Sequence, residues 1–393
     1  MKLAYIVFWI GMLGVAYTYF LYPIVLLVLY VTAQAYRDLR FLAGRRNRRV
    51  APLVAAEIPS ITLIIPAYNE EEHLAEKLAN FDGIEYPADK LEIIFVSDGS
   101  NDGTNSLLED VSDPRIKVVL LQEHLGKAFA LNCAVRSASH DILVFSDAST
   151  LLAKDALQKL VRHFCSPTVG AVCGSIRFHA SAESKQTEGV YWRYEGMLRL
   201  MEARLGSTLT ASGALYALRR DAYVPLTPET VLDDFVTVMN ARKMGLAVIY
   251  DPEAVAFDFA PSNISGEFTR RVRLARGSFG CLSFFLRVPL PWFTRFAFVS
   301  HKLLRWLVPI MALMLLTSNL LLIGTHRPWY TGAAALQLAL YIWAAIGAVF
   351  AKYVRGLPFA QLAYFLLAMN LALLIGLFRA LMGRPQTVWQ RVS

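Results

Sequence analysis

An almost unbroken apolar run near the start of the chain, from Leu3 to Val31, constrains the fold more than any other feature. It is longer than the roughly 20 residues that span a bilayer, and far longer than the apolar core of about 7 to 15 residues in a signal peptide. The run therefore predicts a retained transmembrane helix within residues 1–35. Hydrophobic residues also make up 55% of the chain, which is more than two ordinary soluble domains would contain.

Three further apolar segments predict three more membrane spans, at about residues 306–323, 329–350 and 357–378 of a carboxy-terminal region that covers residues 299–393. Basic residues crowd the ends of the apolar runs, namely Arg45, Arg46, Arg48, Arg49, Lys302 and Arg305. By the positive-inside rule, the basic linker at residues 36–60 places the domain that follows it in the cytoplasm. We therefore expect a multi-pass protein of a bacterial inner membrane. The net charge of the chain is +8, and we expect its basic residues to contact lipid head groups and not nucleic acid.

Between these membrane segments, residues 61–265 change to short apolar runs that alternate with amphipathic ones. The runs typical of buried strands begin at Ile61, Leu91, Ile116 and Ile142. Helical stretches lie between them, at residues 70–81, 105–111 and 127–137. This βαβ series predicts an α/β domain with a mainly parallel, Rossmann-like sheet. The basic, aromatic and proline-interrupted residues 266–298 that follow suit amphipathic helices in the membrane interface.

Several function classes are excluded by motifs that the chain lacks. The four cysteines form no CxxC pair and have no histidines at zinc-finger spacing, so neither a disulfide framework nor a structural zinc is expected. A GxGxxG pattern does not follow the first strand, which argues against a Rossmann dehydrogenase. Gly126-Lys127 is followed by Ala128 and lacks the earlier glycine of a phosphate loop, which argues against a P-loop ATPase.

Asp147 is the first candidate for chemistry, because it follows the buried strand at Ile142 in the sequence ILVFSDAST. The carboxyl ends of strands in an open α/β sheet line the crevice where ligands bind. Magnesium and manganese prefer oxygen ligands and often bridge a carboxylate to a diphosphate. The alternative is an aspartate that caps the next helix.

Other polar residues have similar placements, each with a structural alternative. Asp98, at the end of the second strand, is either a nucleotide ligand or a turn residue that bonds its own backbone. Lys127 at a helix start either contacts phosphate or is a solvated surface charge. Asp233 and Asp234 either cap a helix or include a general base that takes a proton from an attacking hydroxyl.

Arginines in the basic segment after Gly266 supply the remaining candidates. Arg270, Arg271, Arg273 and Arg276 could face lipid phosphates, but helical spacing places Arg273 and Arg276 on one side together. A pair of arginines there could clamp a diphosphate leaving group, because each guanidinium group offers several donors in a fixed plane.

Taken in order, these motifs resemble those of the family 2 membrane glycosyltransferases, the group that includes hyaluronan, chitin-oligosaccharide, cellulose and poly-N-acetylglucosamine synthases. The resemblance runs from about residue 61 to residue 277 and implies a GT-A type fold. It assigns nucleotide binding to Ala67, Tyr68, Glu70, Asp98, Lys127, Asp147 and Ala148, with Arg273 and Arg276 beside the diphosphate. It assigns a divalent metal, Mg²⁺ or Mn²⁺, to Asp147, the acceptor side to Ser212, Gly213, Ala214 and Asp233, and the catalytic base to Asp234.

Three departures from the family motifs are visible in this chain. Ser149 stands where many members have a second acidic residue of the metal motif. Arg270 replaces a glutamine, and Leu274 replaces the tryptophan that processive synthases associate with the acceptor end of the growing chain. Processivity is therefore an open question at this point.

The resemblance implies inverting transfer of a sugar from a nucleotide donor, with UDP expected, to a hydroxyl of a glycan or lipid acceptor in cell-envelope or extracellular polysaccharide synthesis. A non-processive transfer of one sugar to a lipid carrier is the first alternative. A non-enzymatic membrane export component with a nucleotide-sensing domain is the second. A partner subunit could complete an export pore, because four spans offer few helices to enclose one.

Overall fold

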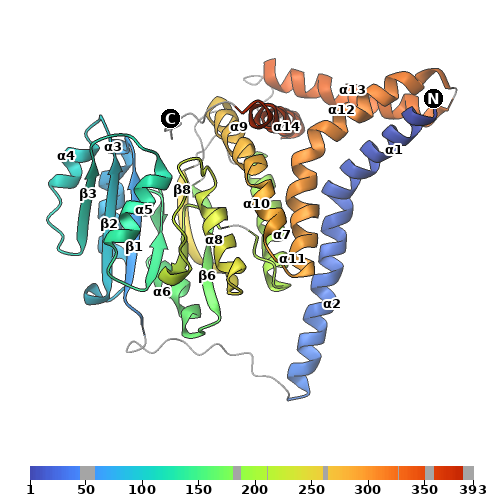
Figure 1. The fold of residues 1–393 in the computed structure, drawn as a ribbon. Helices are drawn as coiled ribbons and strands as arrows, with labels where there is room; N and C mark the ends of the chain where they lie inside the picture. Colours follow the sequence, from blue (N-terminus) through green and yellow to red (C-terminus); the bar gives the residue numbers. More distant parts are fainter. Residues whose placement is uncertain are drawn as a thin grey trace.

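The computed structural model describes residues 1–44, 58–179, 187–209, 211–259, 264–325, 327–349 and 358–383. An α/β domain lies on one side of the molecule and a group of long helices on the other (Figure 1). The arginines at positions 45–49, on which the orientation prediction depends, lie outside the described residues.

Within the described residues, eight strands form one mixed sheet in the order β3-β2-β1-β4-β7-β6-β8-β5. The strands are β1 (Ile61–Ala67), β2 (Leu91–Asp98), β3 (Ile116–Leu121), β4 (Ile142–Phe145), β5 (Leu151–Leu152), β6 (Val169–His179), β7 (Tyr216–Arg219) and β8 (Ala247–Phe259). The first four are parallel to one another, and β6 is parallel to β8, whereas β7 and β5 run antiparallel to their neighbours. The predicted mainly parallel sheet is therefore confirmed, and all four predicted strand starts are correct.

Helices cover both faces of this sheet, because alternate side chains of a strand point to opposite sides. The α/β domain contains α3 (Glu71–Asn80), α4 (Thr104–Glu109), α5 (Lys127–Ser137), α6 (Ala156–Val161), α7 (Thr187–Arg204) and α8 (Asp233–Lys243). On β1, Leu63 packs in one apolar cluster with Leu74 of α3, and Ile64 packs in the other with Leu131 of α5. Burial on both faces explains why the strands read as continuous apolar runs.

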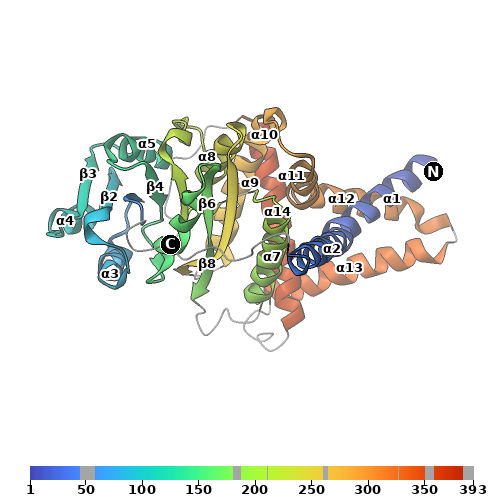
Figure 2. The ribbon, with the colours of Figure 1, turned by 90° about the horizontal axis from the view of Figure 1, so that it is seen from below.

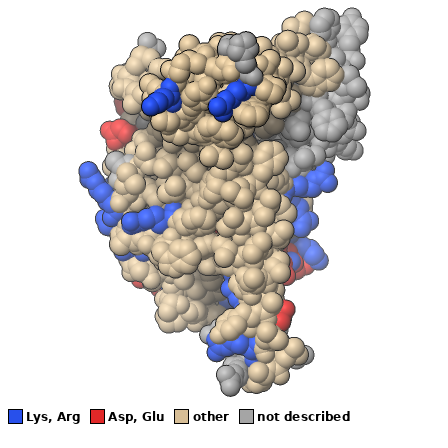
Figure 3. Space-filling view, turned by 90° about the vertical axis from the view of Figure 1, so that its right-hand side faces the viewer, with Lys and Arg blue, Asp and Glu red and all other residues tan. Residues whose placement is uncertain are grey.

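Four helical segments of the described residues are long and apolar enough to cross a membrane: Lys2–Leu42, Trp292–Leu322, Pro328–Val349 and Ala363–Leu381. They are built from α1 (Lys2–Ala16), η1 (Tyr17–Leu21), α2 (Tyr22–Leu42), α11 (Trp292–Ala297), η7 (Phe298–Leu303), α12 (Leu304–Leu322), α13 (Pro328–Val349) and α14 (Pro358–Leu381). The side of the molecule that these helices form is a broad surface with few charged side chains, and Lys and Arg lie at its margins (Figure 3).

The first two of these segments differ from the predicted limits. The first helix continues to Leu42, beyond the expected end at residue 35, and the second begins at Trp292 and not near residue 306. Both contain a π-helical stretch, η1 and η7. In the first segment this stretch ends two residues before Pro23, which has no backbone N–H and so loosens the helical ladder there.

Two helices connect the α/β domain to the membrane helices. They are α9 (Ile264–Gly280) and the shorter α10 (Leu282–Arg287), and they occupy most of the region predicted to form interfacial helices. Gly376 of α14 lets α14 and α9 approach closely, since a Cβ at that position would lie 2.9 Å from the carbonyl oxygen of Val272 in α9. The helix with the basic motif therefore packs directly on a candidate membrane span (Figure 2).

Candidate active site

Carboxylates from two distant parts of the chain meet beside β4. Asp147 follows the end of β4 by two residues, and Asp233 and Asp234 are the first two residues of α8. The ammonium group of Lys127, the first residue of α5, lies between them. Its Nζ is 2.8 Å from Oδ1 of Asp147 and 3.3 Å from Oδ2 of Asp233. The structure thus brings together four residues that the sequence identified separately.

The electrostatics of this cluster separate the roles of its members. Burial alone would lower the pKa of Lys127, but Asp147 and Asp233 outweigh it and hold that pKa above its ordinary value. Burial would raise the pKa of Asp147, but Lys127 outweighs it and holds that pKa low. For Asp234, burial and the neighbouring Asp233 raise the pKa to about 7. Asp147 is therefore a stable anion, whereas Asp234 can take up and release a proton near neutral pH.

The donor set of the cluster fits a divalent cation. Asp147 and Asp233 already direct carboxylate oxygens at one positive charge, which here is the ammonium group of Lys127. The described residues contain no group of three or more His, Cys, Asp or Glu side chains that could hold a metal by themselves. A cation at Asp147 would therefore complete its coordination with phosphate oxygens of a donor and with water, as Mg²⁺ commonly does.

The predicted acceptor-side loop lies directly over this cluster. A Cβ at Gly213 would be 3.0 Å from Oδ2 of Asp147 and 3.3 Å from Nζ of Lys127. A side chain at this position would therefore fill the space beside the two charged groups. Ser212 accepts a hydrogen bond from the N–H of Leu215, which closes the turn, and Ala214 is buried.

The arginines of α9 have different surroundings. Arg273 has a buried Nε atom without a hydrogen-bond partner among the described residues. Burial and Arg270 lower the pKa of Arg273, whereas Asp233 and Asp147 raise it, so its guanidinium group lies in the field of the carboxylates. Arg276 lies one turn further along, where its backbone meets Gly376 of α14. The diphosphate contact stays a prediction for both arginines, and of the two Arg273 is the one that lies in the field of the carboxylates.

The predicted nucleotide side is formed by the loops after β1 and β2. Ala67 ends β1 and Ala148 follows Asp147, and both are buried, so they contribute shape and backbone. Tyr68 and Glu70 are partly exposed, and the N–H of Glu70 donates to Oγ1 of Thr104 at 2.9 Å. This bond joins the two loops, which agrees with a shared role at one edge of the sheet.

Asp98 differs from Tyr68 and Glu70 in that its polar side chain is fully buried. Its carboxylate accepts hydrogen bonds from the N–H groups of Leu125 at 2.9 Å and Gly126 at 2.8 Å, and lies 2.8 Å from Nδ1 of His124. In this structure Asp98 thus fixes the loop that leads into Lys127. Direct contact between Asp98 and a nucleotide stays a prediction.

His124 is a site residue that the sequence did not single out. Its ring stacks on that of Tyr68, with centroids 3.7 Å apart and planes 6° from parallel. The pair forms an aromatic surface next to the loop that Asp98 fixes. The one available signal was the position of a histidine three residues before Lys127. That signal becomes informative only when the loops that follow β1 and β3 are known to meet.

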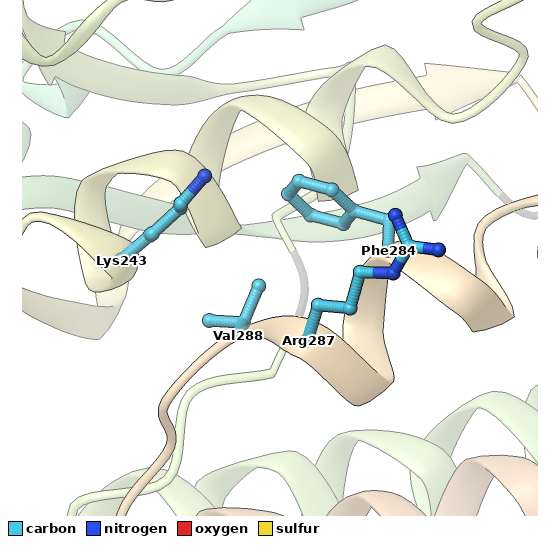
Figure 4. Close-up of a pocket in the computed structure, with 4 residues that line it drawn as sticks. All are labelled: Lys243, Phe284, Arg287 and Val288. Carbon is cyan, nitrogen blue, oxygen red and sulfur yellow. The ribbon is translucent and has the colours of Figure 1, made fainter.

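A small cavity of about 250 Å³ lies elsewhere, between α8 and α10 (Figure 4). Lys243, Phe284, Arg287 and Val288 line it. Lys243 is the last residue of α8, and the carboxylate cluster lies at the first residues of that helix. The cavity is therefore separate from the carboxylate cluster.

Comparison with known proteins agrees with this geometry. Residues 62–224 match the family model described as Glycosyl transferase family 2. The poly-beta-1,6-N-acetyl-D-glucosamine synthase of Staphylococcus aureus (strain COL) is 27% identical over 267 residues, which are 65% of this chain and 63% of that protein. An N-acetylglucosaminyltransferase of Bradyrhizobium diazoefficiens is 28% identical over 297 residues, 70% of this chain and 60% of that protein. The chain thus spans less than two thirds of these relatives.

A solved structure matches over a larger share of the chain. The mannosyltransferase PcManGT from Pyrobaculum calidifontis, in complex with GDP-Man and Mn²⁺, is 26% identical and superposes with a TM-score of 0.70. The match covers 96% of this chain and 100% of that chain. The predicted GT-A type fold and the predicted resemblance are therefore confirmed: residues 62–224 match the family 2 glycosyltransferase model, and the described residues also contain four helices that could span a membrane.

Proposed function

We propose that this protein is a membrane-bound, inverting glycosyltransferase that moves a sugar from a nucleotide donor to a hydroxyl group of a glycan or lipid acceptor. The observation that carries the proposal is the cluster of Asp147, Asp233 and Asp234 around Lys127, with Arg273 beside it. This arrangement combines fixed negative charge for a cation, positive charge for a diphosphate and one carboxylate that titrates near pH 7.

Each residue has a distinct part in the proposed reaction. Asp234 takes the proton from the acceptor hydroxyl as its oxygen attacks the anomeric carbon, and the bond from that carbon to the diphosphate breaks. A divalent cation held by Asp147, with Asp233 as the second candidate ligand, would stabilise negative charge on the leaving diphosphate. Lys127 and Arg273 add further positive charge, and their attraction to the leaving group grows as that group becomes more negative.

A single displacement follows from the distribution of charge among the carboxylates. As in inverting glycosidases, inversion requires one base and an attacking hydroxyl group, without a second carboxylate that acts as a nucleophile. Asp147 and Asp233 are both paired with Lys127, whereas burial and Asp233 raise the pKa of Asp234. The cluster therefore offers one free base.

The donor is proposed to be a UDP-sugar, as the motifs imply. A GDP-sugar is the second candidate, because the mannosyltransferase that superposes on this chain was solved with GDP-Man and Mn²⁺. A panel of UDP- and GDP-sugars, assayed for release of the nucleoside diphosphate in membranes with Mn²⁺ or Mg²⁺, distinguishes them. Loss of turnover with a chelator supports the enzyme, and no metal-dependent turnover of any donor supports a non-enzymatic export component.

The direct test of the base is Asp234→Asn. A general base typically contributes about 10² to 10⁴-fold in rate, so the variant should lose at least two orders of magnitude in nucleotide release and acceptor extension. Asp221→Asn is the matched control, since Asp221 is an exposed aspartate of the same domain. Wild-type rates in Asp234→Asn would remove the base assignment.

The acceptor and the number of sugars added are separate proposals. Polysaccharide synthesis is supported by the synthase from Staphylococcus aureus among the relatives. Single transfer to a lipid carrier is supported by Leu274, which replaces the tryptophan of processive synthases. Product length after incubation with a radiolabelled donor separates the two, because processive transfer gives long chains and single transfer gives one discrete product.

We further propose that the α/β domain faces the cytoplasm, where nucleotide sugars are made. Arg37 and Arg40 lie in the last turns of the long first helix, which agrees with a basic end on the cytoplasmic side. A single cysteine placed in the exposed loop after α8 should be modified by a membrane-impermeant thiol reagent only after the membrane is opened. Modification in intact cells would reverse the orientation.

A further inference from the structure

A fully buried lysine lies beneath the proposed metal motif and has no part in the reaction described above. Lys77 is the seventh residue of α3 and has 0% relative exposure. Lysine is rarely buried completely, because removing its charge from water is unfavourable unless the charge is compensated. Its burial here therefore calls for a function or a specific structural reason.

The ammonium group of Lys77 holds both ends of the turn that begins at Asp147. Nζ donates to Oγ of Ser146 at 2.9 Å, immediately before that aspartate. It also donates to the main-chain carbonyl oxygen of Thr150, the last residue of the turn. The turn itself is closed by a hydrogen bond of 3.2 Å from the N–H of Thr150 to the carbonyl oxygen of Asp147. One side chain thus fastens the two flanks of the four-residue motif.

The same face of α3 also fixes the chain beyond the turn. Asn80 lies one helical turn after Lys77, and its Nδ2 donates to the carbonyl oxygen of Leu152 at 3.0 Å. Its Oδ1 accepts from the N–H of Leu152 at 2.8 Å. Positions three apart on a helix lie on one side. The inner face of α3 is therefore a support for residues 146–152.

The charge environment of Lys77 includes the proposed metal ligand itself. Burial lowers the pKa of Lys77 to about 7, while the carboxylates of Asp147 and Asp258 favour its charged form. The aromatic ring of Phe81 lies 5.9 Å from Nζ. Lys127 forms a direct ion pair with the Asp147 carboxylate, whereas Lys77 is bonded to the turn that carries Asp147.

We propose that Lys77 is a positioning residue of the donor site: it fixes the Asp147–Thr150 turn and thereby sets where the Asp147 carboxylate meets a divalent cation and the donor diphosphate. This inference rests on the proposed function. A fixed turn would also help this chain to hold a metal with Ser149 in place of a second acidic residue, because a rigid ligand loses less conformational freedom on binding than a mobile one.

The test compares Lys77→Met with wild type in the purified full-length protein. Methionine approximates the length of the lysine stem without its donors or charge. We expect the Mn²⁺ concentration for half-maximal turnover to rise by about tenfold or more, because small displacements of a positioning group can cost up to about 10²-fold. The midpoint of thermal unfolding should stay the same or rise, because a buried charge has been removed.

A second readout measures metal binding without turnover. Titration of Mn²⁺ in the presence of UDP or GDP, followed by electron paramagnetic resonance, should show the same weakening in Lys77→Met. Lys77→Arg keeps a cation and several donors and should recover part of the affinity. Lys154→Met is the matched control, since Lys154 is an exposed lysine shortly after the same turn and pairs with Glu85 at 3.0 Å.

The outcomes separate this inference from the proposed function. If wild type turns over a nucleotide sugar and Lys77→Met has the same Mn²⁺ dependence and kcat/KM, the positioning role is wrong and the proposed function stands. If wild type turns over none, the proposed function fails. If Lys77→Met does not fold, Ser146→Ala replaces it: removing this acceptor should raise the half-maximal Mn²⁺ concentration several-fold, and an unchanged value would overturn the inference.

Discussion

The raised pKa of Asp234 makes the pH dependence of the reaction a quantitative test. The base must be deprotonated, so activity should rise with pH through the pKa of this carboxyl. With a pKa of about 7, roughly one tenth of the molecules carry the base form at pH 6 and roughly nine tenths at pH 8. We therefore expect kcat/KM to increase about tenfold between these values. An ordinary aspartate, with a pKa near 4, would give almost no change.

The same shift has a consequence for stability, with a definite sign. A carboxyl whose pKa is higher in the folded state than in the unfolded state costs stability when it ionises. The cost is absent below about pH 4, grows as the pH rises, and is complete above about pH 7. The difference of about three pH units corresponds to about 4 kcal/mol. Asp234→Asn should therefore be inactive and yet unfold at a higher temperature than wild type at pH 8.

The assay measures initial rates of nucleoside diphosphate release at subsaturating donor, with Mn²⁺ kept saturating at each pH. Asp233→Asn is the informative companion, because it removes the neighbouring charge that helps to raise the pKa of Asp234. The rising limb should move to lower pH in that variant. A flat profile between pH 6 and 8 in wild type, or a stabilising effect of Asp234→Asn that is equal at pH 4 and pH 8, would refute the reasoning.

Three further changes test other parts of the structure. Gly213→Ala should lower kcat/KM by about tenfold or more, because the added Cβ would lie 3.0 Å from Oδ2 of Asp147. Gly196→Ala is its control and should leave kcat/KM unchanged, because a Cβ at that helical position would meet open space. Arg273→Gln should raise KM for the donor about tenfold in the same assay, since a charge-assisted contact to diphosphate is lost; an unchanged KM would exclude the contact. Glu195→Gln should destabilise the protein by about 3 to 5 kcal/mol in thermal unfolding, because Glu195 is buried and its loss leaves the largely shielded Lys302 and Arg305 without this carboxylate. Wild-type stability would contradict this.

The sequence predicted the α/β domain well for a physical reason. Strands such as β1 and β2 are buried on both faces, so they read as continuous apolar runs between turn residues. Their carboxyl ends share one edge of a parallel sheet, which is why Asp147 could be identified as a site residue from its position alone. Its neighbours Lys127 and Asp233 were found through motif order, and the distance between them required the fold.

Residues that act through packing could not be predicted in this way. Lys77 lies on an amphipathic helix where a lysine is ordinarily solvated, and only the close approach of α3 to the turn after β4 buries it. His124 likewise depends on the contact between the loops that follow β1 and β3. The limits of the first two long apolar helices were also missed, because their polar and aromatic extensions remain helical where hydropathy has already fallen.

The extensions of these helices contain the joint between the catalytic domain and the membrane. Glu195 and Glu202 of α7 are both buried, and His301 of η7 lies between them, with Nδ1 2.7 Å from Glu202 and Nε2 3.2 Å from Glu195. Tyr22, at the start of α2, donates to Glu202 at 2.6 Å. Buried polar groups that are satisfied by one another specify a single arrangement, because any slip leaves charges unpaired.

This joint links the first long helix, the second long helix and α7 of the catalytic domain through shared acceptors. The π-helical stretches η1 and η7 meet at the same place, where Tyr17 Oη lies 2.8 Å from Ser300 Oγ. An extra residue in a helical turn redirects side chains, and such stretches occur frequently at functional positions. The joint therefore fixes α7 of the α/β domain relative to the first two long apolar helices, since each of the three elements contributes a side chain to the same buried network.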